Sequence, residues 1–428
     1  MFNQGGLSLE QAPPISVVMR FFITASVFGV LLGIILFTNF TGIISFNQSN
    51  MQLIIVHSLA LGVMASFMLG ALFQMLPVIA GVVIERPTEK VMIVHGLLVV
   101  GIVVQLFAFN IASIPLLYLL AVFYLGISLL YALIIMIRRV LQIQDHSSSS
   151  KGVLFALSSF ILAIIFGIYL LLTSGGYIDG VSFLKVKELH YTFAIFGWVS
   201  LLIVSISFQV VEMFYITPKY PAFFSRYLVV MIFILLLVKS FAIIFGMESQ
   251  IITMFLSAIF IVYGGVTLHR LHYRKRPTSD ATVWFWRLGM GLLILSMFIV
   301  FINTFTTLPN NIIFISYITF IGFALSIVFA MVYKIVPFLT WFHLSNQGYM
   351  EAPMMHDVIH PKKAKIHFKI HVAMLITWFF SALLEKADYL IVFSSLLVIA
   401  SFGWLLYHLI YAVKKYNYTQ EHTEKVEW

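Results

Sequence analysis

Long apolar runs separated by short polar segments dominate the chain. Crossing the hydrocarbon core of a bilayer takes about 20 helical residues, and twelve runs are long enough. We predict spans at residues 18–43, 51–83, 91–109, 113–137, 152–173, 189–214, 226–246, 250–269, 284–305, 311–341, 367–384 and 389–413. These runs are predicted to be helices, because an open strand in lipid would leave backbone groups unpaired. The first run is too long for a removable signal peptide, so we expect it to be retained.

The composition supports the same conclusion. Of 428 residues, 61% are hydrophobic and 10% are charged, and the mean hydropathy is +1.04. A soluble domain has roughly 45–50% apolar and about 25% charged residues. We therefore predict an all-α, polytopic membrane protein, with a single membrane domain over residues 1–428 and the lipid bilayer as its main partner.

The basic residues are distributed unequally between the two ends of the predicted helices. If the amino terminus lies inside, 20 of the 25 Lys and Arg residues fall on the cytoplasmic side. This excess predicts cytoplasmic termini, and we expect a bacterial inner membrane. The net charge of +9 then reflects topology and anionic lipid, and it gives no reason to expect nucleic acid binding. Because there is no cysteine, disulfides, thiolate metal sites and iron–sulfur clusters are excluded.

Three of the predicted helices share one pattern, which indicates an internal repeat. Each has a long polar residue near its cytoplasmic end and a glycine twelve residues earlier. The long polar residues are Gln74, Gln209 and Lys334. The glycines are Gly62, Gly197 and Gly322. We predict three four-helix repeats, at approximately residues 1–145, 146–277 and 278–428, with the second, sixth and tenth helices equivalent.

The repeated residues suggest two physical roles. The glycines would let a neighbouring helix or a flat ligand approach closely. The long polar residues, together with Glu212, should face the protein interior, because a polar group in lipid needs a partner. Such an intramembrane polar ring would conduct protons or ions, bind an anion, or only hold the three repeats together.

Twelve helices in three four-helix repeats resemble the catalytic subunit of haem–copper oxidases and nitric oxide reductases. His57, a Gly-rich run and then Pro77 resemble the helix that supplies a low-spin haem ligand in that family. His190, seven residues before Gly197-Trp198, resembles a segment of short oxidase-like proteins. The stretch from His57 to Gly62 is also similar to one in the NnrS-type family, which is tied to the nitric oxide response and contains haem and copper.

The chain departs from that family at the oxidase centre. Where the family has a His-x-His pair on the tenth helix, this chain has Phe314 and Ser316. Residues 227–246 contain no His, and Ala194 replaces the expected tyrosine. The resemblance therefore implies the fold without the usual oxygen-reducing centre. We do not expect standard cytochrome oxidase activity, and whether the protein is an enzyme stays open.

His57 and His190 are the predicted cofactor ligands, near the same face of the membrane. Neutral imidazole ligates haem iron or copper, so haem b, copper or both are expected, with no cofactor as the alternative. On a regular helix Met64 and Met68 would point within about 20° of His57, and a His–Met stripe suits copper(I). The alternative is that these methionines only pack. Gly197 would leave a slot for a flat ring.

Two further groups are expected to be structural. Lys239 is predicted to extend outward from its helix. Four histidines share one basic segment: His356, His360, His367 and His371. Because Pro361 interrupts the segment and lysines are interleaved with it, we interpret it as solvated and lipid-facing.

The leading hypothesis is a haem- or copper-associated membrane protein of haem–copper-oxidase-like fold, related to nitric oxide or to electron transfer, with a partner in the respiratory chain. One alternative is a cofactor-free transporter or channel that uses the polar ring. Another is an accessory or assembly subunit of a respiratory complex.

Overall fold

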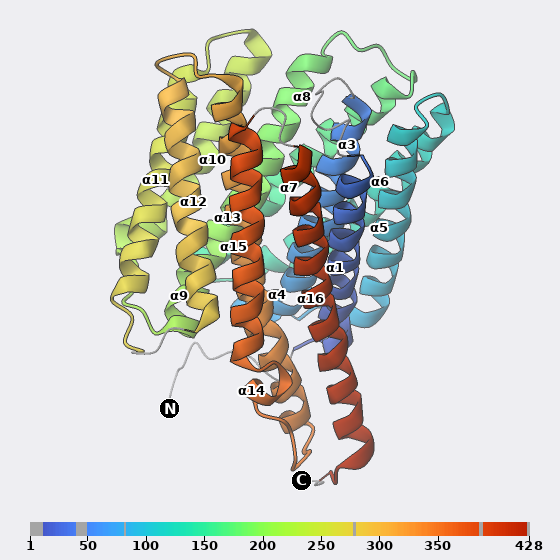
Figure 1. Ribbon diagram of the computed structural model, residues 1–428, viewed down its shortest axis with the longest axis vertical. Helices are drawn as coiled ribbons and strands as arrows, with labels where there is room; N and C mark the ends of the chain where they lie inside the picture. The colour runs from blue at the N-terminus through green and yellow to red at the C-terminus, as the bar shows by residue number, and fades with distance from the viewer. Residues whose placement is uncertain (1–11, 40–48, 81–82, 277–279, 385–387, 426–428) are drawn as a thin grey trace. The chain divides into compact units, whose positions relative to one another are not determined.

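The computed structural model describes residues 12–39, 49–80, 83–276, 280–384 and 388–425. Within them, twelve helices are long and apolar enough to cross a membrane. This confirms the predicted all-α polytopic class, and each predicted run overlaps one of these helices. Ten of the spans are the single helices α1 (Ile15–Thr38), α5 (Pro87–Asn110), α6 (Pro115–Val140), α7 (Ser148–Ser174), α10 (Ala222–Phe245), α11 (Gln250–His272), α12 (Ala281–Asn303), α13 (Asn310–Asn346), α15 (Pro361–Leu383) and α16 (Asp388–His422) (Figure 1).

The other two spans are composite. One consists of α3 (Ser49–His57), the π-helical η2 (Ser58–Ala65) and α4 (Ser66–Ala80). The other consists of α8 (Phe183–Thr192), the π-helical η3 (Phe193–Ser200) and α9 (Leu201–Tyr215). A short helix, α14 (Met355–Val358), precedes α15.

Three of the single-helix spans extend five or more residues beyond a predicted limit. The 37 residues of α13 span about 55 Å, well beyond a hydrocarbon core of about 30 Å. The α15 helix begins at Pro361 and α16 continues to His422. Hydropathy alone marks only the lipid-embedded part, whereas Lys, Gln and Glu continue a helix readily in water.

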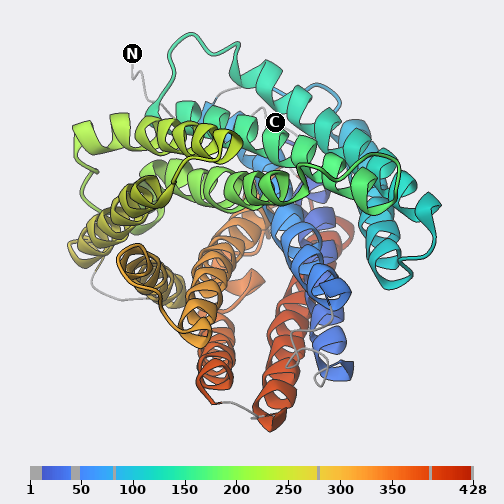
Figure 2. The same ribbon diagram turned by 90° about the horizontal axis from the view of Figure 1, so that it is seen from above.

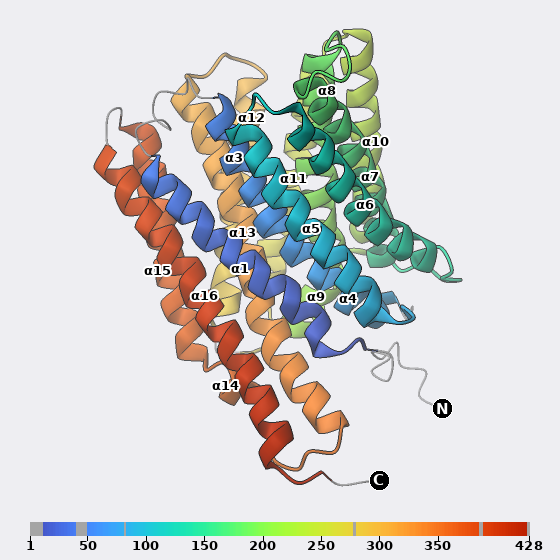
Figure 3. The same cartoon turned by 90° about the vertical axis from the view of Figure 1, so that its right-hand side faces the viewer.

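The described residues group into two compact units. Of the described residues, those within 12–18 and 69–259 form unit 1, and those within 19–68 and 260–425 form unit 2. In unit 1, α5 pairs with α6, and α7 packs against α6, α8, η3 and α9 (Figure 3). Stacked rings of Phe160 and Trp198, with centroids 4.2 Å apart, fix the contact of α7 with η3.

Unit 2 is built around α13. This helix packs against α12, α15 and α16, and α15 also contacts α12 and α16. The bundle is seen along its helices in orange to red in Figure 2. The α1 helix joins α16 through Gly29, whose missing Cβ leaves room for the ring of Phe402.

The two π-helices lie at matching positions. Aligning Gly62 with Gly197 also aligns Ser58–Ala65 with Phe193–Ser200, the whole extent of η2 and of η3. Each π-helix is eight residues long, and π-helical turns in α-helices occur often at functional sites. The aligned part of α13 is α-helical. The single domain and its three repeats stay a prediction.

Each aligned glycine faces a close neighbour within its own unit. A Cβ on Gly62 would come 2.8 Å from Phe28, and one on Gly322 would come 2.8 Å from Leu375. A Cβ on Gly197 would come 2.5 Å from the Cβ of Ser159 on α7. At these three positions the absence of a side chain therefore permits close packing.

Candidate functional site

His57 ends α3 immediately before η2. Its Nδ1 lies 2.9 Å from the carbonyl oxygen of Leu53, one helical turn earlier, and the residue is half-buried. A carbonyl oxygen only accepts hydrogen bonds, so Nδ1 carries the proton. The lone pair of the neutral ring is then on Nε2.

His190 is anchored in the same way by a different helix. Its Nδ1 lies 2.8 Å from the carbonyl oxygen of Ala163 on α7, which again places the proton on Nδ1. Gly167, one turn further along α7, makes room for the ring, because a Cβ there would come 3.0 Å from Cε1 of His190. Thus α7 fixes both the tautomer and the position of this imidazole, and η3 begins three residues later.

Metal- and haem-ligating histidines commonly donate their other ring nitrogen to a carbonyl or carboxylate. Both His57 and His190 have this arrangement. The sequence could indicate the two histidines, but it could not identify Ala163 and Gly167, because their role depends on how α7 packs against α8.

The π-helical turn changes the predicted His–Met stripe. The stripe assumed a regular α-helix between His57 and Met64, but η2 lies between them. A π-helical turn holds one additional residue, which shifts later side chains by about 100° relative to the α-helical register. Accordingly, His57 is half-buried, whereas Met64 and Met68 are buried with 5% and 6% exposure. Metal binding by these residues stays a prediction.

Two tests of cofactor fit give different answers. The donor chemistry fits, because two neutral imidazoles with Nδ1 protonated suit iron or copper. The space beside Gly197 does not fit a flat ring, because the side chain of Ser159 occupies it. Among the described residues, no group of three or more His, Cys, Asp or Glu side chains is arranged to hold a metal ion.

The predicted polar ring divides between the units. Gln74, Gln209 and Glu212 belong to unit 1, whereas Lys334 belongs to unit 2, so their convergence stays a prediction. Gln74 is fully buried, and neither of its amide atoms has a hydrogen-bond partner among the described residues. Glu212 accepts a hydrogen bond from the backbone N–H of Tyr220 at 2.8 Å.

Lys334 forms an ion pair that the sequence analysis missed. Its Nζ lies 2.5 Å from Oδ2 of Asp280, the N-cap residue of α12. The other carboxylate oxygen accepts from the backbone N–H groups of Thr282 and Val283, at 3.0 and 3.2 Å. Burial by itself raises the pKa of Asp280, but the charge of Lys334 and these hydrogen bonds outweigh it and lower the pKa. The Asp280 carboxylate is therefore charged at neutral pH.

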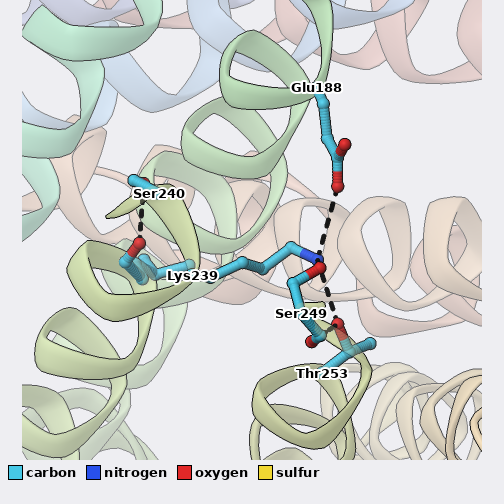
Figure 4. A network of polar contacts seen from close by, with 6 residues as sticks. Glu188, Lys239, Ser240, Ser249 and Thr253 are labelled. Atoms are coloured by element: carbon cyan, nitrogen blue, oxygen red, sulfur yellow. Dashed lines mark hydrogen bonds and ion pairs between the residues drawn. The ribbon is translucent and has the colours of Figure 1, made fainter. Parts of the chain in front are cut away.

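A buried lysine, Lys239, has partners on α8, on α11 and at the residue that precedes α11 (Figure 4). Lys239 of α10 is 8% exposed, and its Nζ lies 3.6 Å from Oε1 of Glu188 on α8. The amine also donates to Oγ1 of Thr253 at 2.9 Å and to Oγ of Ser249 at 3.3 Å. This network is half-buried beside the chain segment that carries His190. All of these partners of Lys239 belong to unit 1, so the prediction that its side chain extends outward was wrong.

The interpretation of the four-histidine segment was wrong for two residues. His367 and His371 are fully buried in unit 2, whereas His356 and His360 are exposed. The lysines of this segment lie on the exposed face of α15. The i, i+3, i+7 spacing of Ala364, His367 and His371 could have revealed the buried face.

Comparisons of the sequence with protein-family models and with curated proteins gave no match. The fold therefore defines the class, a multi-pass helical membrane protein, and the function has to be argued from the residues.

Proposed function

We propose that this protein binds haem or copper within the membrane and serves electron transfer or nitric oxide chemistry, with His57 in unit 2 and His190 in unit 1 each serving as a ligand in its own unit. The observation that supports the proposal is the anchoring of Nδ1 in both rings by carbonyl oxygens, those of Leu53 and Ala163. This tautomer presents the Nε2 lone pair, the donor that a haem iron or copper ion requires.

Each anchor has a chemical consequence. A hydrogen bond from Nδ1–H fixes the rotation of the ring and makes Nε2 a stronger donor. Gly167 keeps the His190 ring against α7, so the ring would not have to reorganise when a ligand binds. A bound haem b would supply one-electron redox chemistry and affinity for diatomic gases.

The proposed setting is a bacterial inner membrane with both termini in the cytoplasm. This follows from the excess of Lys and Arg at one end of the helices. His57 and His190 would then lie toward the opposite face, where an external electron-transfer partner of the respiratory chain can approach. Oxygen reduction by a standard binuclear centre is not part of the proposal, because Phe314 and Ser316 offer no imidazole ligands.

The test is an absorption spectrum of detergent-purified protein, oxidised and dithionite-reduced, with iron and copper quantified in the same sample. The proposal predicts a Soret band that shifts on reduction, or stoichiometric copper, and a loss of either in His57→Ala and His190→Ala. His422→Ala is the matched control, because that imidazole is exposed and contacts Tyr418 of its own helix through the carbonyl oxygen and the stacked ring. A featureless, metal-free sample would refute the proposal.

Gln74 favours a second candidate, a cofactor-free transporter or channel. A fully buried amide whose four hydrogen-bonding positions lack protein partners is costly in lipid unless a polar solute or water reaches it. This candidate predicts a flux of ions or protons in proteoliposomes that Gln74→Leu abolishes, while the neighbouring Met75→Leu leaves it intact. Equal fluxes in protein-containing and protein-free vesicles would count decisively against it.

A further inference from the structure

Two histidines on one face of α15 are completely enclosed within unit 2. His367 and His371 have 0% exposure, and each is held by a serine of a neighbouring helix. Nε2 of His367 lies 2.8 Å from Oγ of Ser401 on α16, and Nε2 of His371 lies 2.8 Å from Oγ of Ser326 on α13. Three helices therefore fix the orientation of this pair of rings.

The hydrogen bonds of Ser326 assign the tautomer of His371. The hydroxyl of Ser326 lies 2.6 Å from the carbonyl oxygen of Gly322, which can only accept its single proton. Nε2 of His371 must therefore be the donor to Ser326, so the lone pair of this ring is on Nδ1.

Both Nδ1 atoms lack a partner. They are buried, and neither makes a hydrogen bond to any residue that the structure describes. Leaving a polar atom buried without a partner is unfavourable, so two such atoms four residues apart favour binding of a ligand between the two rings. The i, i+4 spacing puts both rings on one side of the helix, as in histidine pairs that bind metals.

The surroundings of the pair determine which ligand fits. The ring of Phe285 lies 5.7 Å from that of His367 and 5.6 Å from that of His371. The ring of Phe329 lies 4.6 and 5.2 Å from the same two imidazoles. Both histidines thus share one aromatic wall, and aromatic rings attract a cation where water is excluded.

We propose that His367 and His371 bind a soft monovalent d10 metal ion, copper(I), through Nδ1. Two neutral nitrogen donors suit the linear coordination of such an ion, whereas zinc needs four ligands, several of them anionic in many sites. A single positive charge also costs less to bury than a double charge. The lysines of α15 do not oppose binding, because they lie on its exposed face. This site is independent of His57 and His190.

The test is an anaerobic titration of metal-stripped, full-length protein in detergent with copper(I), in competition with a chromophoric copper(I) chelator. Wild-type protein is expected to remove one more equivalent of copper(I) from the chelator than either His367→Gln or His371→Gln removes. Gln retains a group that can bond to the facing serine. Ser326→Ala and Ser401→Ala should weaken the site by about 10–100-fold, as removal of groups that orient metal ligands does.

Two controls separate this site from other copper binding. His422→Gln removes an exposed imidazole and should leave the titration unchanged. The double variant His57→Ala/His190→Ala should retain the equivalent, which distinguishes a failure of this proposal from a failure of the proposed function.

X-ray absorption of the His57→Ala/His190→Ala variant with one equivalent of copper(I) tests the site while both of its own histidines are in place. A two-coordinate nitrogen shell is expected, and a sulfur-containing shell would overturn the proposal. Wild-type protein that fails to compete for copper(I), or an equivalent that persists in both Gln variants, would overturn it as well.

Discussion

Lys334 of α13 donates a hydrogen bond to Asp280 at the first turn of α12, with Nζ and Oδ2 2.5 Å apart. Asp280 is also the N-cap of α12, so its side chain both links α13 to α12 and caps the amino-terminal end of α12. Asp280→Asn should keep the cap and lose the charge, at a cost of about 1–2 kcal/mol for this partly exposed pair. Asp280→Ala should cost about 1 kcal/mol more through loss of the cap.

Thermal unfolding in detergent, followed by intrinsic fluorescence, measures both effects. Adding Lys334→Met to Asp280→Asn should recover much of the loss, because the main penalty is the loss of the carboxylate that faces the Lys334 charge. If Asp280→Asn and Asp280→Ala were both neutral, the ion pair would have no stabilising role.

The same pair predicts a pH dependence. A carboxyl whose folded pKa is below its unfolded value stabilises the protein above the unfolded pKa, and this stability is lost as the pH falls through the folded pKa. The pKa of Asp280 lies below its ordinary value of 3.8 because Lys334 and the capping hydrogen bonds outweigh burial. The stability difference between wild type and Asp280→Asn should therefore be constant from about pH 7 to 5 and shrink below about pH 4. A difference that disappears already near pH 6 would contradict this assignment.

Hydropathy predicted the class of the fold because lipid imposes a strong rule. Each span needs an apolar run of a given length, and the twelve runs could be counted directly. The ends of α13 and α16 could not be predicted in this way, because water tolerates both helix and loop. The π-helical turns η2 and η3 were also missed, since nothing in residues 58–65 or 193–200 distinguishes them from an α-helix.

Long-range pairing was the main gap for the candidate site. The sequence identified His190 and Lys334 from their polar character, but not Ala163 or Asp280, which lie 27 and 54 residues away. Charge patterning also misled the interpretation of His371. Lysines near in sequence suggested solvent, although on a helix they occupy the opposite face.

Replacing Glu188 alone should destabilise the protein more than replacing both Glu188 and Lys239. Glu188→Ala leaves the Lys239 amine, on a side chain 10% exposed, with only hydroxyl partners, and should cost about 1–3 kcal/mol. Glu188→Ala/Lys239→Met should restore most of that stability, because an apolar chain of similar length tolerates burial. Unfolding temperatures of the single and double variants form the cycle that measures the coupling. Additive losses would show that the two residues do not interact.

Gly197 should not tolerate a methyl group. A Cβ at this position would lie 2.5 Å from the Cβ of Ser159, so α7 and η3 would have to separate. We expect Gly197→Ala to cost about 1–3 kcal/mol, the range for overpacking. Gly96→Ala on α5 is the matched control, because nothing lies within 4 Å of its added Cβ. The control should be neutral or stabilising by up to about 1 kcal/mol. Equal melting temperatures for the two variants would contradict close packing at Gly197.

Gly167→Ala tests whether the position of His190 matters for a bound cofactor. The new methyl group would lie 3.0 Å from Cε1 and 3.3 Å from Nδ1 of His190, so the ring would have to move by a few tenths of an ångström. This shift should lengthen the hydrogen bond to the Ala163 carbonyl oxygen and weaken cofactor binding by about 10-fold. That is the lower end of the range for changes to groups that orient a metal ligand.

The measurement is the Soret absorbance or the copper content of detergent-purified protein, with the unfolding temperature recorded in parallel. Gly126→Ala on α6 is the control, since its added Cβ would make only an ordinary 3.6 Å contact with Ile168. Loss of cofactor in Gly167→Ala alone, with both variants folded, would support His190 as a ligand. Unchanged occupancy in Gly167→Ala would mean that the position of the His190 ring does not control binding.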